Sequence, residues 1–331
     1  MTEPQRFTVR HVSVYRYSEP VSFGEHRMML FPRASHDLRL VTNRLVITPT
    51  PTRLHWLHDV FDNSVAIATF AGEASELRFD SEVTLEHFEA PMPDYALEPY
   101  AVNWPFSYTN EEACDLVNAR SRRHPDPEVD EWARRFVPIP GVVRSSEKKA
   151  GNAGDKAADK RARKAEDQPD DQPDDKPADR QGDSSTMALL RAMTLEIKST
   201  FSYVRRTEKG VNRPGDTLRS RSGSCRDFAV LMMDAVRSLG LAARFVSGYL
   251  FVPEHDATQG GGATHAWLQI YLPGAGWVDF DPTNSIVGNR HLIRVAVAWN
   301  YDQALPLWGT WHGAPHSFRG LQVDVSVTEG K

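Results

Sequence analysis

The chain has 331 residues, of which 40% are hydrophobic, so it is long enough for about two domains with buried cores. Its net charge of −5 and its 25% of charged residues are ordinary, and they exclude a strongly basic nucleic-acid-binding protein and a strongly acidic one. Because no stretch reaches the roughly 18 apolar residues that span a bilayer, and the N-terminus lacks the apolar region of a signal peptide, we expect a cytoplasmic protein with no membrane or nucleic-acid partner.

The first predicted unit is an all-β domain over residues 1–95. Residues 7–88 contain short apolar runs that turn residues interrupt. In one of these runs the apolar side chains recur at even spacing, at Leu77, Phe79, Val83 and Leu85. A period of two is typical of strands with one buried face. The polar sequence Asp62-Asn63-Ser64 lies between two apolar runs and predicts a tight turn between strands.

A second domain is predicted over residues 96–142 and 187–331. Helical spacing of apolar residues over 110–137 marks its first part. Between Val143 and Met187 the sequence contains no Ile, Leu, Met, Phe, Trp, Tyr or Val. Such a segment buries too little apolar surface to offset the entropy that is lost on ordering. We therefore predict that residues 143–186 form a disordered, charged insertion within the second domain.

The rest of the second domain alternates between helical and strand patterns. Apolar residues at helical spacing predict one helix over 187–201 and another over 228–239, which ends at Gly240. Strand patterns follow, at 244–252, 266–272, 276–280 and 321–327. Helices followed by antiparallel strands predict the α+β fold class for this half of the chain.

Cys225 is the first residue that suggests chemistry. The chain has only two cysteines, Cys114 and Cys225, which are too few for a disulfide framework, so we expect a free thiol. Cys225 precedes a predicted helix, whose N-terminal amides and dipole favour a thiolate by roughly 0.3–2 kcal/mol. Gly223 would leave room for substrate, and Ser222 or Ser224 could cap the helix. A small buried residue at a helix start explains the local pattern equally well.

His265 and Asp281 lie at the ends of two successive predicted strands. If these strands pair as a hairpin, each residue is eight positions from Pro273, and their side chains meet. A carboxylate beside an imidazole fixes its tautomer and stabilises the imidazolium. A single histidine of this kind is more often structural. The combination of Cys225, His265 and Asp281, each at the end of an element, predicts a Cys-His-Asp triad.

Four linked motifs resemble the core of the transglutaminase-like superfamily. They are Arg-Ser-Gly-Ser-Cys-Arg-Asp-Phe-Ala at 221–229, Leu-Gly-Leu-Ala-Ala-Arg-Phe-Val-Ser-Gly-Tyr-Leu at 239–250, Thr-His-Ala-Trp at 264–267 and Gly-Trp-Val-Asp-Phe-Asp-Pro-Thr-Asn at 276–284. The N-terminal segment is similar to the β domain that precedes this core in bacterial members. The resemblance implies a papain/transglutaminase-like core, in which the helix that carries the nucleophile packs on an antiparallel sheet.

The resemblance also implies a role for each matching residue. Cys225 corresponds to the nucleophile, His265 to the general base and Asp281 to the carboxylate that orients it. The Cys225 thiolate would attack an amide carbonyl, and a thioester would form as the amine leaves. The Tyr203 hydroxyl could join the Cys225 backbone amide in binding the oxyanion, although a core or rim position explains this tyrosine as well.

The sequence alone does not determine the shape of the cleft, because two tryptophans and one glutamine have more than one interpretation. Trp267 and Trp277 are expected either to line the cleft or to fill the core. Gln269 stands where an acidic residue is frequent in the superfamily, and the insertion at 143–186 interrupts the core. Neither departure touches the three residues of the predicted triad, but both could change substrate access.

Three functions fit this pattern. The leading one is a peptidase or amidohydrolase that acts on a peptide or protein amide. Cross-linking by a protein-glutamine gamma-glutamyltransferase shares the same first step, and a non-catalytic peptide-binding module is the third. The resemblance suggests ATP-grasp ligase-like proteins as partners. We expect no cofactor and no metal, because the pairs His55/His58 and His312/His316 lack the companion ligands of a zinc motif.

Overall fold

The computed structural model of the chain describes residues 3–88, 96–137, 185–206, 209–252 and 264–330. It confirms the α+β class, with a β domain ahead of a mixed core. The predicted insertion at 143–186 lies outside the described residues except for its last two, and the second of these, Thr186, already begins helix α4. No helix among the described residues is long and apolar enough to cross a bilayer.

The N-terminal sheet is built on one very long strand. Strand β1 (Gln5–Met28) lies at its centre, in the order β2-β5-β1-β4-β3. The other strands are β2 (Leu38–Thr48), β3 (Arg53–His58), β4 (Ser64–Thr69) and β5 (Glu73–His87). The even-spaced residues of β5 identified from the sequence are all buried, at no more than 1% exposure. The predicted turn at 62–64 connects β3 to β4.

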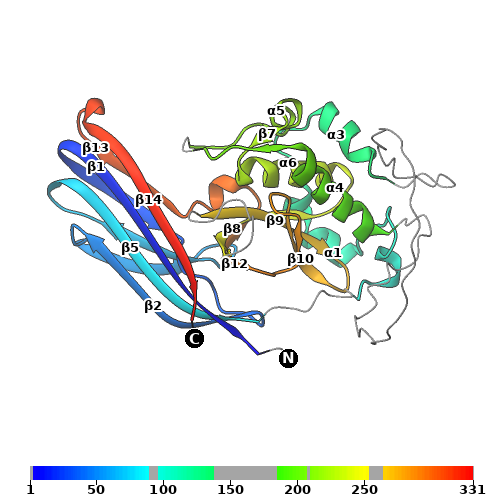
Figure 1. Ribbon diagram of the computed structural model, residues 1–331, viewed down its shortest axis with the longest axis horizontal. Helices are drawn as coiled ribbons and strands as arrows, with labels where there is room; N and C mark the ends of the chain where they lie inside the picture. Colours follow the sequence, from blue (N-terminus) through cyan, green and yellow to red (C-terminus); the bar gives the residue numbers. More distant parts are fainter. Residues whose placement is uncertain (1–2, 89–95, 138–184, 207–208, 253–263, 331) are drawn as a thin grey trace, which may run out of the picture.

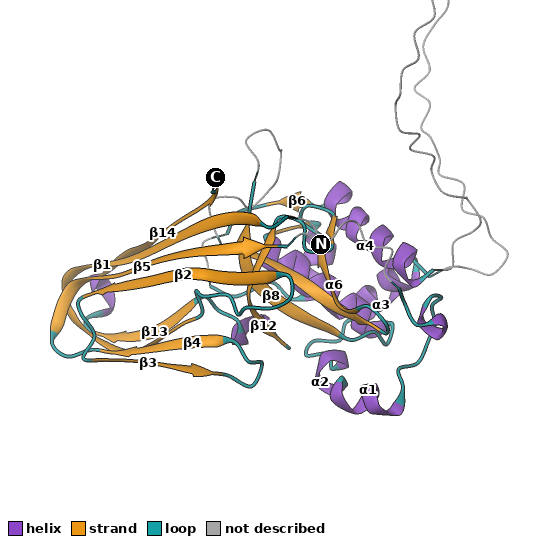
Figure 2. Ribbon diagram, turned by 90° about the horizontal axis from the view of Figure 1, so that it is seen from below, coloured by secondary structure: helices purple, strands orange, loops and turns teal. Residues whose placement is uncertain are grey.

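Two C-terminal strands also belong to this sheet. Strands β13 (Leu307–His312) and β14 (Phe318–Glu329) both pair antiparallel with β1, and Figures 1 and 2 show β14 lying beside it. The strand expected at 321–327 is therefore present, but its assignment to the domain spanning 187–331 was wrong. Alternating apolar residues identify a strand without identifying its partner, and β1 is long enough to accept new strands along its free side.

The mixed core has a five-stranded sheet, one face of which packs against the helix Cys225–Ser238. The sheet has the order β11-β10-β9-β8-β12. Its strands are β8 (Ala243–Leu250), β9 (His265–Leu272), β10 (Gly276–Asp281), β11 (Ile286–Val287) and β12 (Leu292–Ala298). The helices are α1 (Asn110–Asp115), α2 (Val117–Arg120), α3 (Pro127–Arg134), α4 (Thr186–Thr200), α5 (Pro214–Ser220) and α6 (Cys225–Ser238). Short 3-10 turns lie at Pro99–Ala101 and Tyr301–Gln303 in this core, and another, Pro315–Ser317, connects β13 to β14 in the first sheet.

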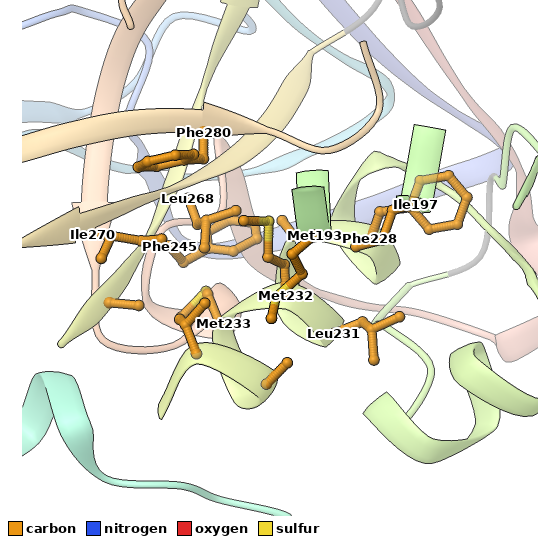
Figure 3. Packing of buried hydrophobic residues seen from close by; sticks show 14 of the residues in the cluster. Met193, Ile197, Phe228, Leu231, Met232, Met233, Phe245, Leu268, Ile270 and Phe280 are labelled. Carbon is orange, nitrogen blue, oxygen red and sulfur yellow. The ribbon is translucent and has the colours of Figure 1, made fainter. Parts of the chain in front are cut away.

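Helix α6 packs its apolar stripe directly against the sheet. Phe228 and Met232 on the helix are buried together with Leu268 and Ile270 of β9, and Figure 3 shows these side chains close together. Burying a side chain of this size stabilises a fold by about 1.5–3 kcal/mol. The same packing fixes both the start of α6 and the start of β9, which are the two positions that the predicted site needs.

The two domains meet through a tight turn and a buried histidine. The Asn63 amide donates to the backbone oxygen of Val297 in β12 and accepts from its backbone nitrogen, both at 2.8 Å. In the turn itself, Asp59 accepts hydrogen bonds from the backbone nitrogens of residues 61 and 63. At a second point of contact between the domains, His11 Nδ1 of β1 lies 3.0 Å from the Tyr249 hydroxyl of β8. The N-terminal domain is thus hydrogen-bonded to the sheet that carries the predicted triad.

Candidate active site

Cys225 is the first residue of α6, and Ser224 is its N-cap. The carboxylate of Asp227 accepts hydrogen bonds from the Ser224 backbone nitrogen at 2.8 Å and from its hydroxyl at 2.7 Å. Such a cap satisfies amide groups that the first helical turn leaves unpaired. The sulfur is therefore held at the positive end of a well-capped helix. Cys225 is buried, at 7% exposure.

Asp227 also connects the nucleophile helix to the loop before α5. Its second oxygen accepts from the Asn212 backbone nitrogen at 2.6 Å and from Arg206 Nη1 at 3.1 Å. The carboxylate is fully buried, and Arg206 is its ion-pair partner among the described residues. Arg206 and Asn212 were not identified from the sequence. One sequence signal was available: an acid, Asp227, stands three residues after the Ser224 cap, and such an acid accepts hydrogen bonds at a helix start.

A two-stranded ladder brings Tyr203 to the same place. Strand β6 (Ser202–Tyr203) pairs in parallel with β7 (Ser222–Gly223), which sets Tyr203 opposite Gly223. Burial and the charge of Cys225 raise the pKa of the Tyr203 hydroxyl to about 12, while Arg205 and Arg226 oppose this rise. The tyrosine is thus within electrostatic reach of the sulfur, and it keeps its proton across the neutral range.

Gly223 does not leave an open space for substrate, contrary to expectation. A Cβ at this position would lie 2.8 Å from Asp227 Cβ and 3.3 Å from a ring carbon of Phe228. The space that the missing side chain leaves is occupied by the first turn of α6. Gly223 is therefore required for the close approach of β7 to the helix, because any larger residue would displace the capping carboxylate.

His265 and Asp281 are in direct contact, but by a different register from the one expected. The hairpin closes through 273–275, so Gly276 pairs with Leu272 and Phe280 with Leu268. Continuing this register sets Asp281 opposite Trp267, and His265 is its diagonal neighbour on the same face. The His265 Nε2 atom lies 2.8 Å from Asp281 Oδ2, and neither side chain is exposed.

Asp281 is held by two further donors. Its Oδ1 accepts from the Thr283 backbone nitrogen at 2.9 Å, and its Oδ2 accepts from the Asn284 side-chain amide at 2.9 Å. Burial would raise the pKa of Asp281, but His265 and these donors hold it below the ordinary value. Asn284 was not identified as a site residue, although its place three residues after Asp281 was part of the recognised motif.

The charge on His265 is set by both of its polar neighbours. Burial alone would lower the pKa of His265, but Asp281 and Cys225 together raise it to about 10. The Nδ1 atom is buried and has no hydrogen-bond partner among the described residues. Since Asp281 occupies Nε2, the interaction with Cys225 involves the Nδ1 side of the ring. The raised pKa of His265 favours an imidazolium held between the Asp281 carboxylate and Cys225.

Neither of the two tryptophans that were expected to line the cleft or to fill the core lines a cleft. Trp267 is fully buried, so it fills the core and does not line a cleft. Its ring stacks on His265 with centroids 5.9 Å apart, and its Nε1 donates to Asp279 at 2.6 Å, which braces the imidazole from behind. Trp277 stands at the other end of β10 from Asp281, with the Arg244 guanidinium 4.2 Å above its ring. It does not line the site around Cys225.

Neither Gln269 nor the remaining cysteine belongs to the site. Gln269 accepts a hydrogen bond from Arg244 Nε at 2.8 Å, so an amide is accommodated where an acid is frequent in the superfamily. Cys114 is exposed on α1. The described part of the chain contains no group of three or more His, Cys, Asp or Glu side chains that could hold a metal ion.

Comparisons with known proteins bear on this arrangement. A model of the bacterial transglutaminase-like N-terminal region matches residues 7–86, and a model of the transglutaminase-like superfamily matches residues 176–282, which include Cys225, His265 and Asp281. An uncharacterised protein of Mycobacterium tuberculosis is 26% identical over 98% of this chain and 94% of its own length.

Two further proteins are similar to parts of the sequence or to the fold. The protein-glutamine gamma-glutamyltransferase of Pseudomonas aeruginosa is 33% identical, over 22% of this chain and 11% of its own length. The crystal structure of a candidate cysteine protease from Cytophaga hutchinsonii superposes with a TM-score of 0.62 at 15% identity, and covers 100% of this chain and 93% of that chain. At that identity the likeness concerns the fold alone.

Proposed function

Since the chain belongs to the transglutaminase-like superfamily, with the bacterial N-terminal region of that superfamily before its core, we propose that it is a thiol-dependent enzyme that cleaves amides through a thioester on Cys225. The observation that carries this proposal is the buried contact of His265 with Asp281 at 2.8 Å, together with the electrostatic coupling of His265 to Cys225. A positioned acid, base and thiol are the elements that nucleophilic catalysis requires.

The first half-reaction uses groups that are already in place. The Cys225 thiolate attacks the carbonyl carbon of an amide, and the resulting oxyanion accepts a hydrogen bond from the Cys225 backbone amide. The Tyr203 hydroxyl is proposed as the second donor, since it stays protonated and senses the charge on Cys225. As the C–N bond breaks, the His265 imidazolium gives its proton to the departing amine, and the acyl group remains on sulfur as a thioester.

The second half-reaction regenerates the thiol. Neutral His265 takes a proton from water, the hydroxide equivalent attacks the thioester, and a carboxylic acid leaves as the Cys225 thiolate re-forms. If an amine replaces water, the product is a new amide, which is the reaction of a protein-glutamine gamma-glutamyltransferase. That alternative is favoured by the partial similarity to the Pseudomonas aeruginosa enzyme of that name.

One assay separates these outcomes. The protein is incubated with a glutamine-containing peptide library and a labelled amine, and free ammonia, backbone cleavage and amine incorporation are measured. Hydrolysis gives ammonia or cleaved peptide without label, whereas cross-linking gives label in the peptide. Cys225→Ala should abolish every product. If the wild-type protein forms no product with any library member, a peptide-binding module without catalysis is the better account.

The surroundings of the enzyme are also part of the proposal. We propose a cytoplasmic location, as expected from the sequence, and ATP-grasp ligase-like partners, as expected from the family resemblance. Fractionation of cells tests the first, and affinity purification of the full chain tests the second. Recovery from a periplasmic or membrane fraction contradicts the location, and purification without any ligase-like protein argues against the partner.

A further inference from the structure

The segment that leads to the nucleophile carries an unusual charge. Residues 204–226, named here the cationic segment, hold seven basic residues and only two acidic ones, Glu208 and Asp216. The whole chain, in contrast, has a net charge of −5. The basic residues are Arg205, Arg206, Lys209, Arg213, Arg219, Arg221 and Arg226. Positive charge is thus concentrated in the part of the chain that ends at Cys225.

Ion pairs neutralise only part of this charge. Arg206 pairs with Asp227 at 3.1 Å, and Arg219 contacts carboxylates of α3 and α5. Arg205 is exposed and forms no ion pair with any described residue. Two acids of the site are already engaged, Asp227 by Arg206 and Asp281 by His265. Among the described residues, Arg205 thus has no acidic partner.

Arg205 and Arg226 lie beside the reacting groups. Arg226 follows Cys225 in the first turn of α6, and Arg205 comes two residues after Tyr203, whose strand pairs with Gly223. The charges of both arginines act on the Tyr203 hydroxyl, in opposition to the charge of Cys225. Clustered charges of one sign at a site attract substrates of the opposite sign and raise their association rate.

We propose that the acyl donor is an acidic peptide, with carboxylate side chains next to the amide that Cys225 attacks. Arg205 is the main specificity-determining residue, because it is exposed and not engaged by a described acid, and Arg226 reinforces it. This inference rests on the proposed amide cleavage. It adds a substrate class that the triad itself does not specify, because the triad contacts only the reacting amide.

The test uses three peptides that share one reporter amide and differ only in the flanking residues, which are Glu, Gln or Lys. For the wild-type protein, kcat/KM should fall in the order Glu, Gln, Lys, with about tenfold between the first two at low salt and less at high salt. Arg205→Gln should reduce the Glu preference to near parity, and Arg205→Glu should reverse it. Arg44→Gln, an exposed change on β2, should keep the wild-type order.

A second readout does not depend on turnover. The Glu peptide should slow the alkylation of Cys225 by iodoacetamide in the wild-type protein, and should do so less in Arg205→Gln. Equal kcat/KM for all three peptides, with equal protection of Cys225, overturns the inference and leaves amide cleavage standing. Absence of turnover for all three peptides, in a protein whose Cys225 is alkylated normally, overturns the proposed function and this inference together.

Discussion

His265 depends on Asp281 for its charge, because burial alone would lower its pKa. Asp281→Asn keeps the size of the side chain but removes the carboxylate. The pKa of His265 should then fall, so that the imidazolium is lost within the neutral range and the thiolate loses its counter-ion. Acylation should slow by about 10²–10⁴-fold near pH 7. Single-turnover acylation across pH measures this.

The matched control is Asn284→Ala, which removes one of the donors to Asp281 but leaves its charge. It should reduce the rate much less than Asp281→Asn. An Asp281→Asn protein with an unchanged rate and pH profile would mean that His265 does not act as the acid and base of this reaction.

Asp227 is a buried carboxylate, and its replacement should lower the free energy of unfolding. Asp227→Asn leaves Arg206 without its carboxylate and weakens the cap of α6. Breaking a buried ion pair from one side costs about 3–5 kcal/mol, and less here because Arg206 is 22% exposed. Urea unfolding should show a loss of about 2 kcal/mol or more. Asp216→Asn, an exposed acid, should lose under about 1 kcal/mol, and equal losses in both variants would refute this reading.

Sequence patterns predicted that each residue of the proposed triad stands at the end of a helix or strand, but not how the neighbouring side chains pack. Cys225 and His265 stand at the starts of elements whose apolar periodicity is strong. Gly223 was misjudged, and the place of Trp267 was left open, because local sequence does not show which side chain fills a space. The hairpin register differs by two residues, because the turn is centred on Gly274 and not on Pro273 as assumed. The catalytic roles of the triad remain predictions.

At the scale of elements, the turn between β3 and β4 holds the two domains together. Asn63 is buried, and its amide satisfies both backbone groups of Val297. Asn63→Ala leaves these groups unpaired, so the free energy of unfolding should fall by about 2–4 kcal/mol. Chemical denaturation measures this fall. Thr52→Ala, which removes an exposed hydroxyl contact, should change it by less than about 0.5 kcal/mol. Equal losses in both variants would show that Asn63 stabilises the protein no more than an exposed hydroxyl contact does.

Individual elements followed closely from periodicity. The helix predicted over 228–239 is α6, Cys225–Ser238, and its extra first turn comes from a cap that lies outside the apolar stripe. The strands expected at 244–252, 266–272 and 276–280 correspond to β8, β9 and β10 with shifts of two residues or fewer. The pairing of β6 with β7 was not foreseen, because two-residue strands carry no periodic signal.

At the scale of the whole molecule, a buried histidine makes the domain contact sensitive to acid. Burial lowers the pKa of His11 to about 4, and the ring contacts Tyr249 and Ser13. In the unfolded chain the ordinary value is 6.5. The folded protein therefore binds the proton less well, so this stabilisation is complete above pH 6.5 and is lost as pH falls toward 4.

The expected size of the effect follows from the two pKa values. Between pH 7 and about pH 4.5, His11 should contribute a loss of about 2–3 kcal/mol in the free energy of unfolding. His11→Gln can still bond to Tyr249 but does not titrate, so its stability should fall less over the same range. The measurement is denaturant unfolding of both proteins at several pH values. Parallel curves for the two proteins would show that His11 is not the sensor.

The division into domains was the least predictable feature. The charge pattern and the two kinds of periodicity separated a β domain from a mixed core. The return of β13 and β14 to the first sheet depends on pairing between residues about 300 positions apart, which no local pattern encodes. The chain thus begins and ends in one sheet, with the core inserted between its strands.

The proposed chemistry requires Cys225 to react as a thiolate paired with His265. Its most direct test is the pH dependence of iodoacetamide alkylation at Cys225, followed by mass spectrometry in a Cys114→Ser background that removes the exposed thiol. A thiolate paired with an imidazolium should be alkylated rapidly down to about pH 6, and much more slowly at that pH in His265→Ala. Alkylation that rises only near pH 8.5, as for an ordinary thiol, and that is unchanged in His265→Ala, would contradict it.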